Sequence, residues 1–302
     1  ILEKYKKVLK EYDVTNVKVI ATTAVREADN KEIFLDTLRR KTDLLIEVLS
    51  VGDVIYYIDA YISHKLKDSY PLHTKNLIIA EIGAGSLDIS VMRKGFTVMN
   101  LGLPLGTLRL KKMMAKLDGS HEETLEALKE HIQTDILYFK KMLPKIQIDD
   151  IILIDENYTY LQSILPGKKK ESDFFQFTVE DSQNVLAEVS DKNVEEIVRT
   201  YKIPREVAET LSSYTVMLNT FFSLTENKYI YILEASLSGA ILANILFDLE
   251  LSEKYNKKNQ LISVAKFFCQ KFDADMEHVQ HVAHLSGILF NHFKDLLGLK
   301  EE

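Results

Sequence analysis

The fold is decided by residues 76–92, which read NLIIAEIGAGSLDISVM. An apolar run over residues 76–80 leads into a turn with two glycines, and alternation of apolar and polar residues resumes at Leu87. Two such segments around a glycine turn are typical of antiparallel strands joined as a hairpin. Residues 96–101 have the same character, so we expect a third strand and an antiparallel meander.

Short apolar or β-branched segments alternate with helical patterns on both sides of this meander. From Leu261 onward the spacing of apolar residues is helical only, so we expect a domain change near residues 256–258. The sequence therefore predicts an α/β fold with a separate helical end. The predicted strands lie at 17–23, 45–49, 151–155 and 229–233, and the predicted helices at 1–12, 30–41, 53–66, 107–142, 194–200, 205–224 and 238–249.

The composition excludes several classes of protein. The chain has 302 residues, 46% of them hydrophobic, yet no apolar run reaches the roughly 18 residues that a membrane-spanning helix needs. A net charge of -7 argues against duplex nucleic acid as a partner, because phosphate neutralisation needs clustered positive charge. The single Cys269 excludes an intrachain disulfide and fits a reducing compartment, so we expect a cytoplasmic protein.

The glycine turn is the strongest candidate for chemistry. Glycines between two strands let backbone N–H groups approach an oxyanion without a Cβ in the way. Glu81 and Asp88 flank the turn, and such carboxylates would hold a divalent metal through water or position an attacking water. The alternative interpretation is an ordinary hairpin in which Gly83 and Gly85 only supply positive φ angles.

A second candidate lies at residues 21–28, which read ATTAVREA. Two hydroxyls and Arg26 follow the end of a predicted strand, and this places a guanidinium at the edge of a sheet where α/β proteins commonly bind ligands. The alternative interpretation is a helix cap by Thr22 or Thr23, with Arg26 in solvent.

Three motifs together resemble the exopolyphosphatase/guanosine pentaphosphatase (Ppx/GppA) family. Residues 21–30, ATTAVREADN, are similar to the family signature ATSAVR-x-A-x-N, and residues 81–88, EIGAGSLD, resemble its phosphate loop DIGGGSTE. Residues 103–110, LPLGTLRL, resemble its LPLGAVRL. The order and spacing of the three motifs agree with the family over residues 1 to 255.

This resemblance implies an actin/sugar-kinase-like (ribonuclease H-like) fold with the ligand between two lobes. The first lobe would cover residues 1–100 and the second residues 101–255, and residues 256–302 would open a helical HD-like domain. The family's first phosphate loop, DxGSNS, would lie before Ile1. We therefore expect a divergent member that is truncated at both ends.

The resemblance also implies an activity, namely hydrolysis of the terminal phosphate of inorganic polyphosphate or guanosine pentaphosphate with Mg²⁺. The family's habit of dimerising adds a homodimer as an expectation. Carried over position by position, the metal ligands are Glu81 and Asp88, and the catalytic positions are Asp53, as a poor substitute base, and Glu81. The phosphate-binding residues are Gly83, Ala84, Gly85, Ser86 and Arg26.

Several of these positions depart from the family pattern. The family's catalytic Glu is the second acid of SGxEEA, and residues 50–55, SVGDVI, place Val54 there. Valine cannot accept a proton, and the loss of a general base typically costs about 10²–10⁴ in rate. Ala84 replaces a loop glycine, and residues 155–156 add two negative charges that would repel a polyanion. The alternative to a weakened hydrolase is therefore an inactive phospholigand-binding or regulatory protein.

Overall fold

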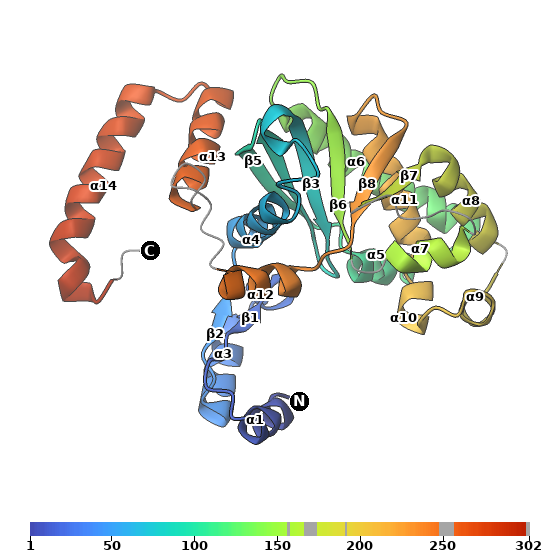
Figure 1. Cartoon of the computed structure of the whole chain (residues 1–302), viewed down its shortest axis with the longest axis horizontal. Helices are drawn as coiled ribbons and strands as arrows, with labels where there is room; N and C mark the ends of the chain where they lie inside the picture. Colours follow the sequence, from blue (N-terminus) through green and yellow to red (C-terminus); the bar gives the residue numbers. More distant parts are fainter. Residues whose placement is uncertain (156–157, 166–173, 191, 248–256, 300–302) are drawn as a thin grey trace.

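A computed structural model describes residues 1–155, 158–165, 174–190, 192–247 and 257–299 (Figure 1). Its centre is a six-stranded sheet in the order β5-β4-β3-β6-β8-β7, and a separate two-stranded sheet pairs β1 with β2. The predicted α/β class is therefore confirmed. The strands are β1 Val19–Ala21, β2 Ile46–Val48, β3 Asn76–Ile82, β4 Leu87–Arg93, β5 Phe96–Leu103, β6 Asp150–Ile154, β7 Phe174–Thr178 and β8 Tyr229–Leu233.

The predicted meander is present. β3 pairs with β4 and β4 with β5, both antiparallel, and the register places Glu81 directly opposite Asp88. β6 and β8 extend the sheet in parallel to β3. The turn between β4 and β5 takes positive φ angles at Lys94 and Gly95. The antiparallel edge strand β7 was not predicted from the sequence.

The large sheet crosses the boundary that the resemblance implies near residue 100. This position falls inside β5, and the meander is joined to the rest of the sheet through the parallel pairing of β3 with β6. The two sheets divide instead between β2 and β3. The boundary expected near residue 255 lies outside the described residues.

Helices cover both faces of the large sheet, and the period of two along β3 sends alternate side chains to each face. Ile78 and Ala80 belong to the larger hydrophobic cluster, with α5, α6 and α11. Leu77 and Ile79 belong to the second cluster, with α4 and α12. These five helices are α4 Val51–Lys65, α5 Thr107–Met114, α6 His121–Met142, α11 Leu211–Phe221 and α12 Leu237–Phe247.

The other helices lie outside the five that cover the two faces of the large sheet. α1 Leu2–Glu11, α2 Thr23–Arg26 and α3 Lys31–Thr42 accompany the small sheet (Figure 1). α7 Tyr158–Ile164, α8 Val179–Ser190, α9 Val194–Tyr201 and α10 Arg205–Ala208 lie near β7 and α11 (Figure 1). Two single-turn 3₁₀ segments, Leu72–Thr74 and Phe222–Leu224, complete the set.

The predicted helical end consists of α13 Lys257–Lys271 and α14 Met276–Leu297. α13 packs along the outer edge of β5, where the Thr97 backbone N–H donates to the Gln260 side chain over 2.8 Å. Lys257 at the start of α13 forms a 2.7 Å ion pair with Asp53 at the start of α4. In the described part of the chain, no helix is both long enough and apolar enough to cross a membrane.

The packing predicts how strongly the core resists truncation. Phe139 on α6 is fully buried in the larger cluster, so Phe139→Ala leaves a cavity. We expect this variant to lower the free energy of unfolding by about 3–5 kcal/mol in urea titration. The neighbouring Tyr138 is 55% exposed, and Tyr138→Ala should change stability by no more than about 0.5 kcal/mol. Equal losses in the two variants would contradict this assignment of the core.

Candidate functional site

The glycine turn, residues 83–86, is held by the start of helix α5; we call it the phosphate loop. The Gly83 N–H donates to the Ser86 carbonyl over 2.9 Å and closes the turn. The Thr107 N–H donates to the Gly83 carbonyl over 3.0 Å, and the N–H groups of Leu108 and Arg109 donate to the Ala84 carbonyl over 3.0 and 3.2 Å. The first turn of a helix leaves N–H groups without intrahelical partners, and here the loop carbonyls satisfy three of them.

The glycines in and beside this loop are required by close packing. A Cβ on Gly106 would lie 2.4 Å from the Ala84 and Gly85 backbone, and a Cβ on Gly85 would lie 3.0 Å from the Thr23 side chain. Gly83 and Gly85 are absent from the residues with positive φ. The interpretation of an ordinary hairpin whose glycines supply positive φ is therefore wrong.

The loop carbonyls are hydrogen-bonded to α5, and three consecutive amide N–H groups of the loop are available to a ligand. Within the described residues, the N–H groups of Ala84, Gly85 and Ser86 have no acceptor. Successive backbone N–H groups in a turn form a concave site for an anion. Of the four predicted phosphate-binding residues in the loop, Ala84, Gly85 and Ser86 therefore offer amides of this kind, whereas the Gly83 N–H already closes the turn.

A hydrogen-bonded chain connects Arg26 to this loop. The guanidinium of Arg26 donates to the Leu49 carbonyl over 2.9 Å and to Thr23 Oγ1 over 3.1 Å. Thr23 Oγ1 lies 2.8 Å from Ser86 Oγ, which donates to Asp88 over 3.3 Å. Neither Thr22 nor Thr23 acts as a side-chain cap for α2. The Arg26 side chain is half-buried and takes part in these hydrogen bonds, so the interpretation of Arg26 as a solvent-exposed residue is wrong.

Arg109 is a second cation beside the loop, and it was not among the predicted site residues. Its Nε donates to the Gly85 carbonyl over 2.8 Å, and its guanidinium pairs with Glu27. The guanidinium therefore connects α5, the loop and the chain just after α2. Arg109 lies in the LPLGTLRL stretch that carries the resemblance, so its position in that motif was the available signal.

The two predicted metal ligands lie in different surroundings. Glu81 lines a pocket beside the loop. Asp88 is only 4% exposed, and its Oδ1 has no hydrogen-bond partner among the described residues. Burial raises the pKa of Asp88, while the charge of Arg26 and the hydrogen bond from Ser86 oppose this shift. Both carboxylates point to the same side of the hairpin, because they face each other across β3 and β4.

Asp53 and Val54, which align with the acid pair of the family motif, both have structural roles at the start of α4. The Asp53 carboxylate accepts from the Ser50 N–H over 2.9 Å and from Ser50 Oγ over 2.7 Å, which completes a capping box at the start of α4. Burial disfavours its charge, but the hydrogen bonds from Lys257 and Ser50 prevail and hold the pKa of Asp53 below its ordinary value. Val54 is 1% exposed and belongs to the second hydrophobic cluster.

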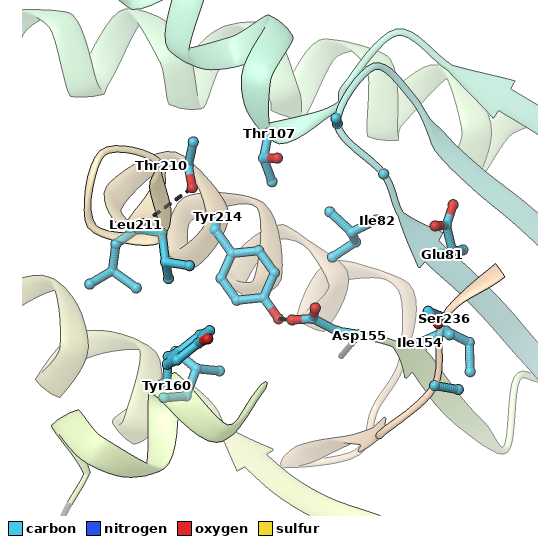
Figure 2. Close-up of a pocket in the computed structure, with 15 residues that line it drawn as sticks. Glu81, Ile82, Thr107, Ile154, Asp155, Tyr160, Thr210, Leu211, Tyr214 and Ser236 are labelled. Carbon is cyan, nitrogen blue, oxygen red and sulfur yellow. Dashed lines mark hydrogen bonds between the residues drawn. The ribbon is translucent and has the colours of Figure 1, made fainter. Parts of the chain in front are cut away.

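A pocket of about 320 Å³ opens beside the phosphate loop. Its walls come from the loop itself, the end of β6, α7, the segment 207–214 and residues 235–236 before α12. Figure 2 shows the Tyr214 hydroxyl pointing at the Asp155 carboxylate, to which it donates a hydrogen bond. No local sequence pattern indicated this pair, because the two residues are 59 positions apart.

The close contact between Gly106 and the loop predicts that one methyl group added at residue 106 weakens phosphate binding. Gly106→Ala must displace the Ala84 backbone, because its Cβ would lie 2.4 Å away, and overpacking of this kind costs about 1–3 kcal/mol. We expect inorganic tripolyphosphate to bind this variant at least about tenfold more weakly by calorimetry.

The matched control for this substitution is Gly287→Ala in α14. Its Cβ would meet nothing within 4 Å, and alanine is the better helix former, so stability should be maintained or increase. Tripolyphosphate binding by this control should equal that of the unmodified protein. Unchanged binding by Gly106→Ala would contradict a role for the loop in holding phosphate.

The comparison with curated proteins gives a partial match. A bifunctional 3-dehydroquinate synthase/phosphatase from Fusobacterium nucleatum is 28% identical to this chain over 113 residues. The match covers 36% of this chain and only 16% of that relative's length.

Two solved structures share the fold. A member of the Ppx/GppA protein family from Aquifex aeolicus superposes with a TM-score of 0.65 at 19% identity, covering 83% of this chain and 80% of that one. An exopolyphosphatase from Cytophaga hutchinsonii superposes with a TM-score of 0.68 at 16% identity, covering 82% and 80%. The sequence model of the Ppx/GppA phosphatase family matches residues 1–246, so the chain belongs to the Ppx/GppA phosphatase family.

Proposed function

We propose that this protein is a phosphoanhydride hydrolase with slow chemistry. Its substrate would be the terminal phosphate of inorganic polyphosphate or of guanosine pentaphosphate. The observation that carries the proposal is the phosphate loop. Its three consecutive amides have no acceptor among the described residues, and hydrogen bonds connect the loop to two cations, to Arg26 through Thr23 and to Arg109 directly.

These groups suit the binding of a terminal phosphate. Backbone amides held by a helix end need no rearrangement when the anion arrives, which favours binding and charge stabilisation. Arg26 is kept in place by Leu49 and Thr23, and Arg109 by Gly85 and Glu27. Both guanidinium groups add positive charge next to an otherwise neutral loop.

Glu81 and Asp88 fit the requirements of Mg²⁺. The ion is commonly held by one or two carboxylates together with substrate phosphates and water. Asp88 offers a buried carboxylate oxygen without a partner among the described residues, on the same side of the hairpin as Glu81. When bound, Mg²⁺ would neutralise phosphate charge and orient the terminal phosphate.

The chemistry is proposed to be slow because the site provides no good base at the expected position. Val54 cannot accept a proton, and Asp53 is already paired with Ser50 and Lys257. A lowered pKa makes the Asp53 carboxylate a weaker base still. Without a general base, turnover should fall about 10²–10⁴-fold below that of a competent enzyme.

The burial of Val54 favours a second candidate function. A side chain that is 1% exposed in a hydrophobic cluster contributes to packing between α4 and the sheet. The second candidate is therefore a phospholigand-binding or regulatory protein that retains the loop and performs no hydrolysis.

Phosphate release with Mg²⁺ from long-chain polyphosphate and from guanosine pentaphosphate tests the proposal. We expect the unmodified protein to turn over at no more than about 0.1 s⁻¹, since a typical enzyme turns over at about 10 s⁻¹ and the loss of the base costs at least about 10²-fold. Val54→Glu places a carboxyl at the catalytic position of the family. Burial there raises the pKa of a carboxyl, which makes it a stronger base, so we expect a higher rate from a variant that thermal unfolding shows to be folded.

Val54→Gln is the matched control, because it buries a polar chain of the same length that cannot act as a base. A rate that rises in the Glu variant alone supports the slow hydrolase. Binding without turnover in all three proteins supports the second candidate. Turnover of about 1 s⁻¹ or more by the unmodified protein would contradict the loss of the base.

A further inference from the structure

Three consecutive peptide groups of the phosphate loop carry the amides proposed to bind phosphate. In a planar trans peptide, the carbonyl of one residue and the N–H of the next point in opposite directions. The carbonyls of residues 83–85 therefore set the directions of the N–H groups of residues 84–86. A donor bonded to one of these carbonyls keeps the amide of the same peptide directed away from that donor. We call the peptide between Gly85 and Ser86 the third peptide.

The backbone of α5 fixes the first two of these peptides. The N–H groups of residues 107–109 donate to the carbonyls of Gly83 and Ala84. The next N–H of the helix, that of Leu110, donates within the helix to the Gly106 carbonyl over 2.9 Å. The first four N–H groups of α5 are therefore all used, and none of them holds the carbonyl of the third peptide.

The Arg109 side chain holds the third peptide instead. Its Nε donates to the Gly85 carbonyl over 2.8 Å, while the backbone N–H of the same residue donates to the Ala84 carbonyl over 3.2 Å. A hydrogen bond from a cation is stronger than one between neutral groups. Because the Gly85 carbonyl and the Ser86 N–H point in opposite directions, the Nε atom lies on the side of the loop away from that amide.

Glu27 orients this guanidinium. Its carboxylate pairs with Nη2 of Arg109. The side chains of Arg109 and Glu27 are 41% and 48% exposed, and an exposed ion pair alone contributes little to stability. A guanidinium is planar, however, so acceptors on two of its nitrogens fix the plane in which it lies. The ion pair therefore keeps Nε directed at the Gly85 carbonyl.

We propose that Arg109 is a positioning residue that directs the Ser86 amide at the phosphate from the opposite side of the loop. The α5 backbone directs the other two amides, and Glu27 keeps Arg109 in place. This inference rests on the proposed function, because the amides must hold the phosphate. It goes further because Arg109 then acts through the loop rather than by touching the phosphate, and because an acid, Glu27, favours the binding of an anion.

Amide NMR of Arg109→Gln, labelled with ¹⁵N at alanine, glycine and serine, tests the division of tasks. Inorganic tripolyphosphate is added until binding to each protein saturates, so that affinity does not affect the comparison. We expect the Ala84 and Gly85 amides to shift as in the unmodified protein and the shift of Ser86 to be largely lost. By calorimetry, tripolyphosphate should bind this variant at least about fivefold more weakly.

Lys112→Gln is the matched control, since it removes one positive charge from an exposed residue of the same helix. The shifts of all three amides should persist in this control, and its affinity for tripolyphosphate should fall by less than about twofold. Thermal unfolding should confirm that both variants are folded.

Glu27→Ala separates positioning from simple electrostatics, because the two predict opposite signs. Removal of a negative charge beside an anion site should tighten binding if charge alone matters. If Glu27 orients Arg109, tripolyphosphate should bind at least about twofold more weakly and the Ser86 shift should decrease. Asp29→Ala is the control, since Asp29 is an exposed acid two positions later. This control should bind tripolyphosphate no more weakly than the unmodified protein.

The outcomes distinguish the positioning role from the proposed function. Undiminished shifts at all three amides in Arg109→Gln, or tighter binding by Glu27→Ala, would overturn the role of Arg109 while leaving the loop as the phosphate site. Loss of all three shifts in a folded Arg109→Gln would overturn the division between helix backbone and side chain. Failure of the unmodified protein to bind tripolyphosphate would overturn the proposed function and this inference together.

Discussion

The carbonyl groups of Gly83 and Ala84 accept hydrogen bonds from the first amides of α5, and the site depends on this contact. It satisfies helix amides that would otherwise need water or a side chain. It also turns the loop so that its own amides at 84–86 are left for a ligand. Gly106 makes the contact possible, because any side chain there would meet the loop backbone.

Local patterns were sufficient for the antiparallel meander and for the position of the loop. The alternation after Leu87 and the glycine turn predicted β3, β4 and β5 correctly. The reason for the glycines was missed, because close approach between Gly85 and Thr23 is a contact across 62 positions that no local pattern shows. For the same reason, the Tyr214 hydrogen bond to Asp155 and the contact of Arg109 with the Gly85 carbonyl appeared only in three dimensions, although the LPLGTLRL motif had placed Arg109 in the resemblance.

The division of the chain shows a different limit of sequence reasoning. The boundary expected near residue 100 came from the family resemblance, whereas strand pairing decides where a sheet ends. β3 hydrogen-bonds to β4 on one side and to β6 on the other, so the meander and the later strands form one sheet. β7 was missed because its five residues, Phe174–Thr178, stand alone among polar and helical segments.

Two neighbouring residues, Asp53 and Val54, are the basis for proposing that this protein binds phosphate but hydrolyses it slowly. Asp53 caps α4 and pairs with Lys257, whereas Val54 packs into the core one position later. The capping by Asp53 and the packing of Val54 do not involve the phosphate loop, which is held by α5 and by Thr23. Under the proposed function, phosphate binding would persist without the base, because different elements hold the loop and the start of α4.

The central claim is that the amides of Ala84, Gly85 and Ser86 bind phosphate. Amide NMR of protein labelled with ¹⁵N at alanine, glycine and serine, titrated with inorganic phosphate, tests this claim directly. The account predicts saturable shifts at these three amides, with the Gly287 amide in α14 unchanged. Shifts confined to other residues, or none at phosphate concentrations where binding is detected, would contradict it.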